Sequence, residues 1–217
     1  MTHAQARAIY NRIGALQDTQ RFYEDPAVRL LVEHADLGAA QAVIEFGCGT
    51  GRHAATMLRE QLPQNAHYVG IDQSQRMVQL SRERLSRWAD RSAVWQTDGR
   101  PVIEADDQSF DRFWSTYVLD LLSPEDIAEV LDEAHRLLRP EGRLCLVSLT
   151  QGETAFQHGV SAVLRRVYAV QPALLGGCRP LRLRSFLDPD RWSILFRRVV
   201  SRFGIPSEVI VATPIGA

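Results

Sequence analysis

The chain has 217 residues, of which 45% are hydrophobic and 24% charged, and its net charge is −1 at pH 7. This composition excludes long disorder, collagen and a disulfide scaffold, and three scattered cysteines are too few for a zinc cluster. All 25 basic residues are arginine, which excludes a lysine Schiff base and the lysine of a P-loop nucleotide site. No apolar run reaches membrane-spanning length and no signal peptide is evident, so we expect a cytoplasmic protein.

The first 39 residues are expected to form a helical segment. The spacing of Ile9, Ile13 and Leu16 predicts one helix over residues 2–17. Pro26 fits the first position of a second helix, which would end near Asp36.

Residues 40–150 alternate between short apolar runs and amphipathic segments. The predicted strands cover residues 42–46, 67–71, 93–96, 111–117 and 143–149. The predicted helices cover residues 52–61, 74–88 and 124–138, and a turn is predicted at 139–142. Ser123 and Asp126 resemble a capping box around the start of the third helix. This alternation predicts a mostly parallel sheet with helices on both faces.

The end of the chain has a different character. Residues 153–171 are expected to be helical, and two strand-like runs at 196–203 and 208–213 predict an antiparallel hairpin around Gly204. Residues 151–217 carry a formal charge of +5 against −6 for residues 1–150. This basic segment either complements the acidic body of the protein or attracts an anionic substrate or lipid headgroup.

A glycine loop follows the first predicted strand. Gly47, Gly49 and Gly51 end the strand and precede a helix, an arrangement that lets a ligand approach the backbone closely. The spacing is G-x-G-x-G, whereas the dinucleotide fingerprint is G-x-G-x-x-G. Glu45 stands two residues before the first glycine, where it would repel a pyrophosphate but suit a ligand ammonium group.

Two further carboxylates follow the next two strands. Asp72 can accept both hydroxyls of a ribose, and Asp98, followed by Gly99, can accept from the exocyclic amine of adenine. Together with Glu45, these positions suggest an adenosine that carries an amino acid rather than a diphosphate.

With these motifs, the chain resembles the class I S-adenosylmethionine-dependent methyltransferases, in the broad group that includes ubiquinone- and menaquinone-biosynthesis enzymes. The segments that carry the resemblance are 45–51, 69–72 with Ser74 and Met77, 97–98, 110–122 and 137–144. The resemblance covers roughly residues 40–150. It implies an α/β fold, with a Rossmann-like, seven-stranded, mostly parallel sheet, helices on both faces and an antiparallel last strand.

The resemblance also implies the organisation of a single domain. Residues 1–39 would form a helical lid, 40–150 the S-adenosylmethionine-binding core, 151–195 a helical insertion that caps the substrate, and 196–217 the terminal hairpin. In this family the flanking segments hold the substrate.

The implied cofactor residues surround the glycine loop and the ends of the next strands. They are Tyr10, Glu45, Gly47, Cys48, Gly49, Gly51, Asp72, Gln73, Met77, Asp98, Gly99 and Thr116. Tyr117 and Asp120 are the candidate catalytic residues: Tyr117 as a contact to the sulfonium or the substrate, Asp120 as a general base, a helix cap or a structural hydrogen-bond partner. Candidate substrate residues are Tyr23, Phe156 and Cys178.

These features predict in-line transfer of a methyl group from S-adenosylmethionine to a small-molecule acceptor, anionic or lipid-linked, with S-adenosylhomocysteine as the product. No metal is expected, because no two histidines have ligand spacing. Nucleic acid is not expected either, since no basic stripe with interleaved aromatics is present. One alternative is an S-adenosylmethionine-binding regulatory protein. The other is an NAD(P)-dependent oxidoreductase, which the loop spacing and the positions of Glu45 and Asp98 disfavour.

Overall fold

The computed structural model of the protein describes residues 21–151, 179–202 and 204–216. The helices predicted at 2–17 and 153–171 lie outside the described residues, as do Tyr10, Phe156 and Cys178. Tyr23 lies on a described helix, but its side chain is outside the described part of the chain.

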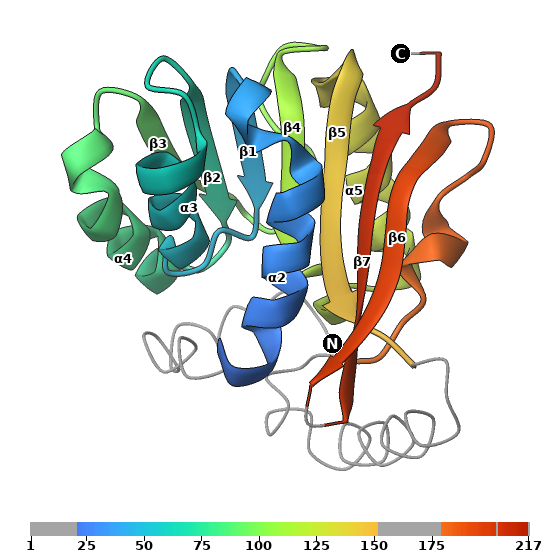
Figure 1. The fold of residues 1–217 in the computed structure, drawn as a ribbon. Coiled ribbons are helices and arrows are strands. Elements are labelled where there is room, and N and C mark those ends of the chain that lie inside the picture. The colour runs from blue at the N-terminus through green and yellow to red at the C-terminus, as the bar shows by residue number, and fades with distance from the viewer. Residues whose placement is uncertain (1–20, 152–178, 203, 217) are drawn as a thin grey trace.

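Seven strands form one sheet in the order β3-β2-β1-β4-β5-β7-β6 (Figure 1). Neighbouring strands are parallel except that β7 runs antiparallel to both β5 and β6. The strands are β1 Ala42–Phe46, β2 His67–Asp72, β3 Ser92–Gln96, β4 Phe110–Thr116, β5 Leu138–Leu149, β6 Trp192–Arg202 and β7 Ile205–Pro214. The predicted fold class is confirmed. The order reverses between β1 and β4, and open α/β sheets bind ligands at such a switch point.

Helices cover both faces of the sheet (Figure 1). They are α2 Arg21–Ala35, α3 Arg52–Thr56, α4 Gln75–Leu85 and α5 Pro124–Leu137. α2, α3 and α4 lie on one face, and α5 lies on the other. A π-helical turn, Met57–Gln61, extends α3, and a 3₁₀ turn, Ser86–Trp88, follows α4. Across the described residues, no helix is long and apolar enough to cross a membrane.

Alternation along the central strands builds two hydrophobic cores. Val43 on β1 faces the core under α2, α3 and α4, whereas Ile44 faces the core under α5. β7 repeats the pattern, with Val211 in the first core and Ile210 in the second. Successive side chains of a strand point to opposite faces, so a sheet covered on both sides needs apolar residues at consecutive positions.

Local sequence signals start two of the helices. Ser123 and Asp126 form the predicted capping box of α5, with each side chain bonded to the other's backbone N–H. The Ser74 hydroxyl accepts from the Met77 N–H at the start of α4.

The predicted start of α2 at Pro26 is wrong, because the helix includes Arg21 to Asp25 and Pro26 lies inside it. Glu24 lies in the first turn, where a carboxylate favours the helix N-terminus.

Two other boundaries differ from those predicted. The turn expected at residues 139–142 is a bulge within β5: Phe110 pairs with Leu138 and Arg112 with Arg143, so a single β4 residue faces four residues. The terminal hairpin begins at Trp192 rather than at residue 196. A register shift between Ile194 and Phe196 interrupts the alternation there, and the sequence pattern therefore placed the start too late.

Candidate cofactor site

The glycine loop joins β1 to α3 at the centre of the carboxyl edge of the sheet. Gly47, Gly49 and Gly51 have φ of 76°, 53° and 72°, in the left-handed region that other residues rarely adopt. A Cβ atom on Gly47 would lie 2.4 Å from Cγ2 of Val118, and one on Gly51 would lie 2.5 Å from Oγ of Ser81. The loop therefore has room only for glycine at these two positions.

Asp72 holds the glycine loop against the start of α4. Its Oδ2 accepts the Gly49 N–H at 2.9 Å, and its Oδ1 accepts the Ser74 N–H at 2.8 Å. Burial raises the pKa of Asp72 to about 6, although the hydrogen bonds from backbone N–H groups oppose this shift. A carboxylate has about four lone-pair sites, so the fixed side chain keeps capacity for ligand hydroxyls.

Glu45 lies at the end of β1, buried beneath the loop. Its Oε2 accepts the Tyr68 hydroxyl at 2.6 Å. Burial raises the pKa of the Glu45 carboxyl to about 8, the Tyr68 hydrogen bond lowers it, and the charge of Asp72 raises it further. A ligand cation beside Glu45 would favour its ionised form.

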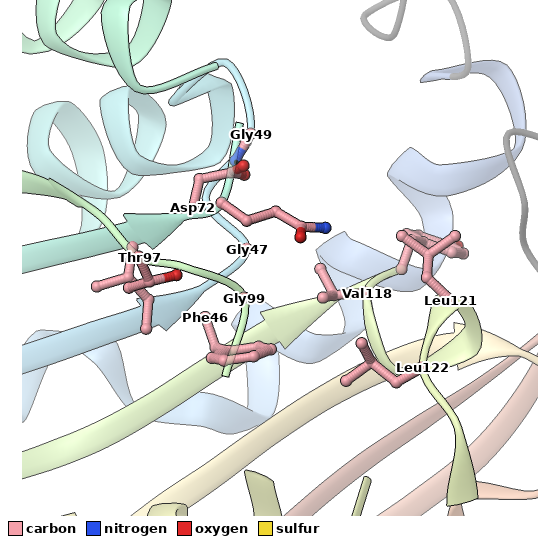
Figure 2. Close-up of a pocket in the computed structure, with 12 residues that line it drawn as sticks. Phe46, Gly47, Gly49, Asp72, Thr97, Gly99, Val118, Leu121 and Leu122 are labelled. Atoms are coloured by element: carbon pink, nitrogen blue, oxygen red, sulfur yellow. Dashed lines mark hydrogen bonds between the residues drawn. The ribbon is translucent and has the colours of Figure 1, made fainter. Parts of the chain in front are cut away.

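Two adjoining cavities open at this edge. The first is drawn in Figure 2, where Asp72 and Gly49 lie on one side and Leu121 and Leu122 on the other. Its lining consists of Phe46, Gly47, Gly49, Ile71, Asp72, Gln73, Thr97, Gly99, Tyr117, Val118, Leu121 and Leu122. The second is more polar, and its lining consists of Glu24, Glu45, Gly47, Cys48, Gly49, Thr50, Arg52, His53, Thr116 and Tyr117.

Gln73 gives the first cavity an unsatisfied acceptor. Its Oε1 atom is buried, and no described residue donates a hydrogen bond to it. A buried polar atom without a partner is destabilising, and a ligand donor that reaches it would remove this cost.

Three residues expected in the cofactor site have different surroundings. Asp98 is exposed and pairs with Arg100, whose guanidinium lies 2.7 Å from its Oδ2 and lowers the pKa of Asp98. Met77 is a core residue on α4 and lines neither cavity. Cys48 lines the second cavity, but burial raises the pKa of its thiol well above the ordinary value, which makes it unreactive.

Of the two candidate catalytic residues, only Tyr117 lines the cavities. Tyr117 lines both cavities, and its hydroxyl lies 2.9 Å from Oγ of Ser207. Asp120 is fully buried and lines neither cavity. Its Oδ2 accepts the Leu149 N–H at 3.0 Å, which is the structural hydrogen bond rather than the general-base arrangement.

Sequence reasoning missed the residues that helices bring to the second cavity. Arg52 donates to Asp25 at 2.8 Å and to Glu24 at 3.4 Å, and His53 lies beside it. Arg52 follows the last glycine directly, which was a usable signal. Glu24 comes from α2, more than 20 residues before the loop, and no local pattern marks it.

In the part of the chain that the structure describes, no three histidine, cysteine or acidic side chains gather as a metal site.

Residues 43–142 match a family model described as a methyltransferase domain. A malonyl-[acyl-carrier protein] O-methyltransferase of Erwinia pyrifoliae is 32% identical over 123 residues, covering 56% of this chain and 42% of that protein. A demethylmenaquinone methyltransferase of Tropheryma whipplei is 31% identical over 147 residues, covering 65% of this chain and 57% of that protein. This chain spans about half the length of the curated relatives it matches.

The fold also matches solved structures. The crystal structure of the [4+2]-cyclase SpnF has a TM-score of 0.66 at 18% identity, covering 88% of this chain and 82% of that one. At this identity the match shows a shared fold and does not transfer a reaction. The glycine loop, the strand order and the family match agree, and residues 43–142 of this chain are similar to a methyltransferase domain.

Proposed function

We propose that this protein transfers the methyl group of S-adenosylmethionine in line to a small-molecule acceptor. The observation that carries the proposal is the pair of carboxylates, the buried Glu45 and the partly buried Asp72, at the ends of adjacent strands beside a loop with room only for glycine. This pair suits a ligand with an ammonium group at one end and a ribose further along.

The two cavities divide the proposed cofactor between them. Asp72 and the unsatisfied Gln73 Oε1 would accept hydroxyl or amine donors of the adenosine half. Glu45 would accept a hydrogen bond from the ammonium group of the methionine half. Arg52 lines the same cavity, and its guanidinium would pair with the carboxylate of the methionine half. Since Asp98 is exposed, pairs with Arg100 and does not line the first cavity, Thr97 and Gly99 are the better candidates for the adenine edge.

The sulfonium methyl is already activated, so the protein mainly aligns the acceptor and excludes water. Val118, Leu121 and Leu122 form an apolar wall of the first cavity, which would exclude water from that side of a bound ligand. Alignment alone can supply roughly 7–11 kcal/mol of the barrier. An O–H or N–H acceptor would also need a base. Glu24 and His53, which line the second cavity, are better placed for that role than Asp120.

The acceptor class is proposed as anionic or lipid-linked. Two of the relatives are named as a malonyl-[acyl-carrier protein] O-methyltransferase and a demethylmenaquinone methyltransferase. The formal charge of +5 on residues 151–217 favours the same two classes.

Calorimetric titration with S-adenosylmethionine, S-adenosylhomocysteine and NADH tests the cofactor assignment. We expect both adenosyl ligands to bind and NADH not to bind. Binding of NADH alone would contradict the proposal and favour the oxidoreductase. Methyl transfer is then measured as S-adenosylhomocysteine formed with a quinol, a malonyl thioester and an uncharged alcohol as acceptors. Saturable turnover with one of them would exclude the alternative of a purely regulatory binding protein.

A further inference from the structure

The place where the two cavities meet identifies a position for the sulfonium. Three residues line both cavities: Gly47, Gly49 and Tyr117. If the adenosine half occupies one cavity and the methionine half the other, the sulfur that joins them lies at this junction. Of the three shared residues, Tyr117 alone carries a side chain.

Tyr117 has an unusual backbone conformation at the end of β4. Its φ is 57°, in the left-handed region that a bulky residue adopts only when its surroundings impose it. Its N–H donates to the Val147 carbonyl at 2.8 Å. The next residue, Val118, packs directly against Gly47. The chain therefore bends here, between the glycine loop and β5.

A hydrogen bond from across the sheet anchors the ring of Tyr117. Its hydroxyl lies 2.9 Å from Oγ of Ser207, and both residues are buried. Ser207 lies on β7, where it pairs with Leu149 of β5, and is 90 residues from Tyr117 in the chain. Because the tyrosine hydroxyl is engaged in this bond, the part of the ring left for a ligand is its aromatic surface.

We propose that Ser207 is a positioning residue, which holds the Tyr117 ring at the cavity junction so that its aromatic face meets the positive sulfonium. The inference rests on the proposed function and specifies how the same site distinguishes the charged cofactor from its neutral product. Aromatic faces attract cations within about 6 Å of the ring centre, and a thioether lacks that charge.

The test uses the ratio of two dissociation constants, S-adenosylhomocysteine over S-adenosylmethionine, measured by calorimetry. The two ligands differ only in the methyl group and the charge on sulfur, so the ratio isolates the contact that the ring makes there. We expect Ser207→Ala and Tyr117→Phe each to lower the ratio about three- to tenfold. Ser207→Thr keeps a hydroxyl and should restore most of it. Ser193→Ala, on an exposed position of β6, is the matched control and should leave it unchanged.

A purely structural role would weaken both ligands equally and leave the ratio unchanged, and this result would overturn the inference. Thermal unfolding of each variant shows whether it is folded, and Tyr117→Phe provides the measurement if Ser207→Ala does not fold. Failure of the proposed function looks different, because the wild-type protein would then bind neither ligand.

Discussion

The carboxyl ends of β2 and β3 carry the same kind of residue, an aspartate, in very different surroundings. Asp72 is the last residue of β2, is partly buried, and accepts two backbone hydrogen bonds, from Gly49 and Ser74. Asp98 follows β3, is exposed, and pairs with the exposed Arg100. A carboxylate at the end of a parallel strand is therefore not a site by position alone. It becomes one where the backbone of a neighbouring loop holds it in place.

The largest effect is expected from a substitution in the glycine loop that contacts Asp72. Gly47→Ala would force a Cβ atom against Val118 at a left-handed position, and we expect it to lower the free energy of unfolding by about 2–4 kcal/mol and abolish binding of S-adenosylhomocysteine. The matched control is Gly38→Ala, where an added Cβ would meet nothing within 4 Å. Urea denaturation and calorimetry measure the two effects. Equal stability of the two variants would show that the loop is not under this constraint.

A third carboxylate, Asp120 after β4, tests whether burial alone makes a carboxylate part of the binding site. It is as buried as Glu45 but lines neither cavity. Asp120→Ala would leave the buried Leu149 N–H without its acceptor, and we expect a loss of about 1–3 kcal/mol of stability. The affinity for S-adenosylhomocysteine, measured at a temperature where the variant is folded, should stay within about threefold of wild type. A large loss of affinity with little loss of stability would return Asp120 to the binding site.

The raised pKa of Glu45 predicts that both the stability of the protein and its ligand binding depend on pH. Its folded pKa of about 8 exceeds the ordinary glutamate pKa of 4.5, so the folded state holds more protons between these values. The stability contribution of Glu45 in the ligand-free protein is therefore fully present below about pH 4.5 and is lost as the pH rises through 8. A ligand ammonium favours the ionised form, so binding should release up to one proton near neutral pH.

Calorimetry in buffers of different ionisation enthalpy measures this proton release. From pH 6 to 8 we also expect the affinity for S-adenosylhomocysteine to rise, by at most about tenfold per pH unit. Glu45→Gln should reduce both effects and leave the part near pH 6 that comes from Asp72, whose pKa is about 6. Proton uptake on binding by the wild-type protein would contradict the assignment of Glu45 to the ammonium group.

The smallest effect is expected from a substitution beside the exposed Asp98. Arg100→Gln removes the ion pair with Asp98, whose two partners are both largely exposed. Such pairs contribute little in water, so neither the thermal midpoint nor the affinity for S-adenosylhomocysteine should change measurably. A clear loss of affinity would show that the Asp98 loop contacts the ligand.

Much of the fold follows from local patterns. The sequence segments of β1 and β2 are short and apolar, and each ends at a glycine or an acidic residue. The capping box at Ser123 marks the start of α5. Such signals lie within a few residues of the element they define. The errors lie where distant packing decides: Pro26 lies inside a helix, and a bulge occupies the segment that a Pro-Glu-Gly sequence marked as a turn.

The site divides in the same way. Glu45, Gly49 and Asp72 were predictable because one loop and two adjacent strand ends bring them together. Glu24 depends on how α2 packs over the sheet, and the Ser207 contact to Tyr117 joins residues 90 positions apart. The exposure of Asp98 depends on the path of the loop after β3, which neither spacing nor composition determines.

The most direct test of the site compares three proteins in one calorimetric titration with S-adenosylhomocysteine: wild type, Asp72→Asn and Asp98→Asn. The substitutions are chemically identical: Asp72 ends β2, where it pairs with Gln96 of the neighbouring β3, and Asp98 lies two residues beyond Gln96. If Asp72 contacts the cofactor, Asp72→Asn should weaken binding by about 30-fold or more, since hydrogen bonds to a charged acceptor contribute roughly 1.5–3 kcal/mol each. Asp98→Asn should remain within twofold of wild type. Equal affinities for all three proteins, or a larger loss for Asp98→Asn, would contradict the assignment of the cofactor to the Asp72 side of the sheet.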